Sequence, residues 1–117
     1  FTVAGNEAGD FWTVQALRDG VDGFNCLKNP EFLAVSPDSK SVYVGRRGTL
    51  TPARICIFSS DPATGALTYV DALLDGTAGV VDMSPWAMAF TADSEYAYVV
   101  SDGEVFVFDR NPLDGTL

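Results

Sequence analysis

The sequence contains no histidine, only two cysteines, and seven basic residues against sixteen acidic ones. Without histidine the chain alone supplies no Ser-His-Asp triad, no Cys-His dyad and no histidine-ligated zinc site. It also has no phosphate-binding glycine loop, no nucleophile elbow and no Cys-x-x-Cys pair. Its formal net charge of −9 opposes binding to nucleic-acid phosphates and to anionic lipid surfaces. We therefore expect no nucleic acid among its partners and no membrane insertion.

Long hydrophobic runs are missing as well. The longest nearly uncharged apolar stretches, such as residues 83–91, are far shorter than the roughly 20 residues that cross a bilayer. The first residue is Phe1 and no segment has the pattern of a signal peptide, so we expect such a peptide to be absent or already removed. At 117 residues the chain has room for one ordinary domain or a few small repeating units.

The composition is that of a packed chain, with 47% hydrophobic and 20% charged residues. The cysteines Cys26 and Cys56 leave two alternatives open. They form one bridge in an oxidising compartment, or they are free buried thiols; the sequence favours free thiols slightly but cannot supply the Cα separation that decides.

An internal repeat organises the chain. Three pieces recur in the same order: residues 14–20 as 70–76, residues 32–44 as 87–99, and residues 55–67 as 105–117. The third piece recurs more faintly at the start, in residues 1–11. A period of about 50 to 56 residues lies in the range of propeller blades.

Each unit reads as a set of short strands. In the first unit, segments rich in Val, Ile, Phe and Tyr lie near residues 31–36, 41–46, 54–60 and 67–73. The turn sequences 36–39, 61–65 and 111–115 combine Pro, Asp or Asn, and in the last two a closing Gly that suits a left-handed conformation. The sequence therefore predicts a four-stranded antiparallel meander, repeated.

Two of these strands are apolar at every position: Ile55-Cys-Ile-Phe58 and Val105-Phe-Val-Phe108. A strand in a sheet with one solvated face would alternate, so both faces of these strands should be covered. Each large apolar side chain left in water would forgo roughly 1.5 to 3 kcal/mol of burial. A radial stack of four-stranded sheets avoids this loss, and we predict an all-β fold made of β-propeller blades.

The segment Leu33-Ala-Val-Ser-Pro-Asp-Ser-Lys-Ser-Val-Tyr-Val44 resembles the signature of the YVTN and lactonase-like β-propeller repeats. Residues 17–23 and 61–67 also resemble the inter-blade and hairpin segments of bacterial proteins with such repeats. The chain departs from the signature at Ser39, where Gly is usual, and in its longer connection 46–54. The resemblance implies the fold; it carries over no catalytic residue, because the matching motifs are strands and turns.

Mapped onto this repeat, residues 1–117 form a single propeller segment of about two blades plus overhanging strands. Residues 1–15 are the end of a preceding blade, 31–73 a complete blade and 86–117 most of the next. Propellers close with four to eight blades, so the segment is expected either to belong to a longer propeller or to assemble with identical copies. We favour the first alternative because both ends look like cuts through blades.

Two groups of residues are candidate sites. Arg46, Arg47 and Arg54 concentrate positive charge and could bind a carboxylate, a phosphate or a sugar, although surface pairing with nearby acids is the simpler interpretation. Trp12 is the aromatic residue best suited to an exposed ligand contact.

A possible metal site is suggested by a second pattern, in which Asp19, Asp22 and Asn25 are spaced at three-residue intervals in a Gly-rich turn. Oxygen ligands suit calcium, but the spacing lacks the EF-hand pattern, so solvated turn carboxylates are favoured and no cofactor is otherwise expected.

These observations leave three hypotheses for function. The first is a structural or binding scaffold segment of a bacterial secreted or surface β-propeller, extracellular or periplasmic, which self-assembles or packs against other blades. The second is part of a lactonase-like hydrolase with its active site on the propeller axis, as the family resemblance implies. The third is a carbohydrate-binding propeller module.

Overall fold

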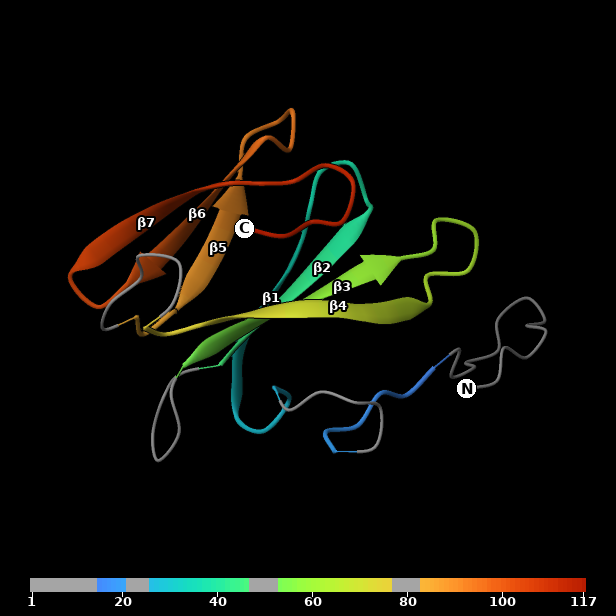
Figure 1. Ribbon diagram of the computed structural model, residues 1–117, viewed down its shortest axis with the longest axis horizontal. Helices are drawn as coiled ribbons and strands as arrows, with labels where there is room; N and C mark the ends of the chain where they lie inside the picture. Colours follow the sequence, from blue (N-terminus) through green and yellow to red (C-terminus); the bar gives the residue numbers. More distant parts are fainter. Residues whose placement is uncertain (1–14, 21–25, 47–52, 77–82) are drawn as a thin grey trace, which may run out of the picture.

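The computed structural model describes residues 15–20, 26–46, 53–76 and 83–117. It contains two antiparallel sheets (Figure 1). The first sheet has the strand order β1 (Pro30–Val35), β2 (Ser41–Arg46), β3 (Arg54–Ser60) and β4 (Leu67–Leu74). The second sheet has the order β5 (Ala87–Phe90), β6 (Tyr96–Ser101) and β7 (Glu104–Asp109). The fold is all-β, and sheets of four and three strands fit partial propeller blades, as predicted.

The strands begin and end within about one residue of the predicted ranges because the turn chemistry fixes them. Gly65 and Gly115 close their turns at φ of +77° and +80°, which confirms the left-handed positions expected from the sequence. Ser39 and its repeat equivalent Ser94 both have φ of +62°. This explains why the resembling family usually places Gly there. Within the described ranges no helix is long and apolar enough to span a membrane.

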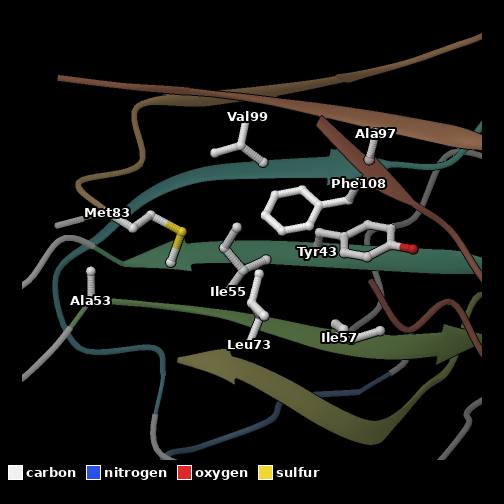
Figure 2. Packing of buried hydrophobic residues seen from close by; sticks show 9 residues of the cluster. All are labelled: Tyr43, Ala53, Ile55, Ile57, Leu73, Met83, Ala97, Val99 and Phe108. Carbon is white, nitrogen blue, oxygen red and sulfur yellow. The ribbon is translucent and has the colours of Figure 1, made fainter. Parts of the chain in front are cut away.

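The main core lies between the two sheets. Tyr43, Ile55 and Ile57 of the first sheet pack against Val99 and Phe108 of the second, and all five are buried (Figure 2). In Figure 1 the second sheet lies over one face of the first, and the last residues of the chain curve back beside β2. The burial of these large side chains, each worth roughly 1.5 to 3 kcal/mol, holds the sheets together.

The opposite face of the first sheet is covered in part by a segment that precedes it in sequence. Leu17 and Leu27 pack there against buried Phe58 and Cys56. Cys26 and Cys56 form a disulfide with a Cα–Cα distance of 6.1 Å. Of the two alternatives that the sequence left open, the bridge is therefore correct and the free thiols, which the sequence slightly favoured, are wrong. The disulfide attaches the covering segment directly to β3.

The expectation that fully apolar strands are covered on both faces is confirmed for one strand only. In β3 all four residues from Ile55 to Phe58 are buried. In β7, Phe106 and Phe108 face the first sheet, whereas Val105 and Val107 remain 60% and 61% exposed. The difference arises because β3 lies between two layers, and no described residue forms a layer beyond the second sheet.

Candidate functional site

The exposed side of the second sheet is a continuous apolar surface. Cross-strand pairs place Val100 opposite Val105 and Tyr98 opposite Val107, so these side chains share one face. All are exposed, although such residues usually lie in a core. We call this surface the open face; it consists of Ala87, Ala89, Tyr96, Tyr98, Val100, Val105 and Val107. Exposed apolar patches of this kind mark interaction surfaces or ligand-binding sites.

The internal repeat shows which surface the open face corresponds to. Under the repeat, Tyr98, Val105 and Val107 align with Tyr43, Ile55 and Ile57. Those three residues of the first sheet are the ones that the second sheet buries. The open face is therefore the repeat equivalent of a surface that already packs against a sheet in this chain.

A compensating exchange of side-chain volume supports this equivalence. In the first sheet Phe32 pairs with Gly45, and a Cβ added to Gly45 would lie 1.8 Å from the Phe32 ring. In the second sheet the corresponding cross-strand pair is Ala87 and Val100. In both sheets this cross-strand pair consists of one larger and one smaller residue, and the larger residue lies on the other strand in the second sheet. The two faces therefore have a similar surface shape at this pair.

One buried arginine joins the two sheets at the edge of the core. Arg110 directly follows β7, and its guanidinium pairs with the Asp38 carboxylate at 2.8 Å, with the arginine side chain fully buried. Its Nε donates to the Tyr43 hydroxyl at 2.9 Å, and its remaining donors reach Ser41 and the Ser94 carbonyl. The Tyr43 hydroxyl in turn donates to the Gly115 carbonyl at 2.6 Å. We call this network the Arg110 junction.

The junction satisfies all of its charged groups. Partial burial alone would raise the pKa of Asp38, but hydrogen bonds from Ser36, from the Lys40 amide and from Arg110 outweigh it and hold the pKa below its usual value. Burial raises the pKa of the Tyr43 phenol despite the nearby Arg110. Because every guanidinium donor has an acceptor, the junction is a contact between sheets, with no donor left for a ligand.

The arginines singled out in the sequence lie at the other end of the first sheet. Arg46 ends β2, Arg54 begins β3, and the two are cross-strand partners. Arg46 is buried, in contrast to the surface pairing favoured from the sequence, because it ends β2, one of the two inner strands of the sheet. Arg47 and Trp12 lie outside the described residues. A ligand at this arginine cluster remains a prediction.

Of the three candidate calcium ligands, only Asp19 is described; Asp22 and Asn25 lie outside the described residues. The Asp19 carboxylate accepts the backbone amides of Cys26 and Leu27 at 2.8 Å. Its repeat equivalent Asp75 accepts the Met83 amide at 2.9 Å. Both aspartates therefore bind backbone amides of residues that precede the following sheet. Within the described ranges no three acidic or cysteine side chains form a metal-binding group.

The sequence did not identify Arg110 as a functional residue. A signal was present, because the repeat places Ser60 in the first unit where the second has an arginine directly after an apolar strand. This signal does not reveal what the arginine binds, because its acceptor Asp38 lies 72 residues away in sequence.

Comparison with known proteins returns structural similarity only; no protein-family model and no curated protein sequence matches the chain. One similar solved structure is named a "putative 6-phosphogluconolactonase" from Bacteroides fragilis, with 25% identity over 74% of this chain and a TM-score of 0.62. A second carries the same name and comes from Bacteroides uniformis, with 25% identity over 74% of this chain and a TM-score of 0.61. The chain spans 23% and 24% of the length of these proteins.

Proposed function

We propose that the chain is a scaffold segment of a β-propeller, whose open face packs against a further β-sheet. The observation that carries this proposal is the equivalence between the exposed residues Tyr98, Val105 and Val107 and the set that the first sheet buries. The further sheet belongs either to the same longer polypeptide or to another copy. The similarity to lactonase-like propellers supports a role within such a stack.

Sedimentation velocity of the 117-residue chain tests this proposal. An unsatisfied apolar face makes the chain associate with increasing concentration, and Val107→Glu shifts it to monomer because it places a charge in the centre of that face. Leu113→Glu is the matched control, since Leu113 is 94% exposed but lies in the turn after β7. A folded chain that stays monomeric at all concentrations, or equal effects of the two variants, would contradict the proposal.

The disulfide supports an extracellular or periplasmic location, which we propose as the site of action. Disulfides persist in oxidising compartments and are rare in the cytosol. Thiol labelling of Cys26 and Cys56 in intact cells tests it: both thiols should be blocked before reduction. Two freely reactive thiols in the native protein would contradict this location.

A lactonase-like hydrolase is the second candidate, and the names of the two similar structures favour it. In that case this chain contributes two sheets to an enzyme whose active site lies on the propeller axis. Hydrolysis of 6-phosphogluconolactone and simple lactones by the complete natural polypeptide tests it. Turnover above that of the heat-denatured protein supports the activity, and a rate equal to the solvent rate removes it.

A further inference from the structure

The second sheet repeats the acceptor half of the Arg110 junction. In the first sheet the Asp38 carboxylate accepts the Ser36 hydroxyl at 2.6 Å and the Lys40 amide at 2.9 Å. In the second sheet the Asp93 carboxylate accepts the Thr91 hydroxyl at 2.5 Å and the Glu95 amide at 3.0 Å. The two turns therefore hold their carboxylates in the same way, at equivalent positions of the repeat.

The two carboxylates differ in what they bind. Asp38 receives the Arg110 guanidinium, whereas no basic side chain of the described residues reaches Asp93. The phenol of Tyr98 is likewise exposed where that of Tyr43 accepts the Arg110 Nε–H.

A hollow of about 310 Å³ adjoins Asp93. Its lining includes the acidic residues Asp93, Glu95 and Asp109, together with Arg110, whose guanidinium is already paired with Asp38. The repeat-equivalent positions of the first sheet include Asp38 and Ser41, which contact Arg110 and the following turn. The hollow thus has the charge and the position expected of a receptor for a cation.

A second copy of this chain can cover the apolar residues of the open face at high concentration, but in its described residues it does not offer a free arginine for Asp93. Its own Arg110 is already buried against Asp38. Its first sheet offers Ser60 at the position equivalent to Arg110. The face of that sheet around Cys56 and Phe58, which would contact the open face, is already covered by the segment bonded through Cys26. Two open faces packed together would bring the carboxylates of Asp93 and Asp109 near like charges, in a chain of net charge −9.

We propose that the open face receives a third blade-type β-sheet that carries an arginine directly after its third strand, and that Asp93 binds this guanidinium. The inference rests on the proposed scaffold function and adds the chemistry of the partner. Charge complementarity at Asp93 sets the register of the third sheet, and the apolar residues of the open face supply most of the buried area.

The experiment compares variants of the complete natural polypeptide by thermal unfolding. Asp93→Asn keeps an oxygen for the Thr91 and Glu95 hydrogen bonds but removes the charge that a guanidinium requires. Asp114→Asn is the matched control, because Asp114 is an exposed carboxylate held in the same manner by Thr116. Asp38→Asn reports the size of the effect at an arginine contact that the structure shows.

We expect Asp93→Asn to lower the melting temperature by about 4 °C, similarly to Asp38→Asn, and Asp114→Asn to change it by less than about 1 °C. Equal small effects of Asp93→Asn and Asp114→Asn would overturn this inference. Val107→Glu then separates it from the proposed function. If Val107→Glu destabilises the polypeptide while Asp93→Asn does not, a sheet covers the open face without the arginine; if neither does, both proposals fail.

Discussion

The disulfide allows the most quantitative prediction. Cys26 and Cys56 are separated by 30 residues, and closing a loop of that length lowers the entropy of the unfolded chain by an amount worth about 3.6 kcal/mol at 25 °C. Both cysteines are almost completely buried, so the variant Cys26→Ala/Cys56→Ala also loses sulfur contacts with the residues around Phe58. We expect the double variant to be destabilised by at least about 3 kcal/mol.

Urea unfolding of the oxidised chain, the reduced chain and the double variant measures this difference. The reduced chain should unfold at a lower urea concentration than the oxidised chain, close to the double variant. The segment that carries Leu17 and Leu27 should also exchange its amide hydrogens faster once the bridge is broken. A loss of less than about 1 kcal/mol, the ordinary effect of one substitution, would refute the view that the bridge holds this segment on the sheet.

Three further predictions concern the junction and the packing of the sheets. Asp38→Asn should destabilise the chain by about 2 to 3 kcal/mol in urea unfolding, because it leaves a buried guanidinium without its counter-charge. Folding lowers the pKa of the Asp38 carboxyl, so this group stabilises the folded chain above about pH 4 and loses that contribution as the pH falls through its lower folded pKa. Acid unfolding of the wild type and of Asp38→Asn measures this difference. Gly115→Ala should lower the free energy of unfolding more than Gly65→Ala does, by about 1 kcal/mol or more. Both glycines have positive φ, but only at position 115 would a new Cβ meet another side chain, at 2.3 Å. Equal costs of the two substitutions would contradict this close approach. Gly45→Val alone should lower the melting temperature, and adding Phe32→Ala should restore part of that loss. A double-mutant cycle of melting temperatures measures this coupling, and additive losses would refute the exchange of volumes.

The strands could be predicted from the sequence because their signals are local. Alternating and fully apolar segments, bounded by turns such as 36–39 and 61–65, gave strand limits close to those of the structure. The internal repeat extended this to the architecture, since a unit that recurs and is apolar on both faces needs neighbours of its own kind. The left-handed Gly65 and Gly115 followed from the same turn chemistry.

Long-range features could not be predicted in this way. The pairing of Cys26 with Cys56 depends on how a preceding segment folds back over β3, which no local pattern specifies. Burial of Arg46 follows from its place on β2, an inner strand of the first sheet. The role of Arg110 requires Asp38 and Tyr43, which lie in another sheet. Contacts between sheets are set by packing across whole layers, which no local pattern specifies, so the exposure of Val105 and Val107 could not be predicted either.

The accessibility of Tyr98 tests the central claim most directly. Hydroxyl-radical labelling of the complete natural polypeptide can compare Tyr98 with Tyr43, its buried repeat equivalent. If the open face packs against another sheet, Tyr98 is labelled almost as slowly as Tyr43. If Tyr98 in the folded polypeptide is labelled as fast as in the unfolded one, the open face is bare and the account is contradicted.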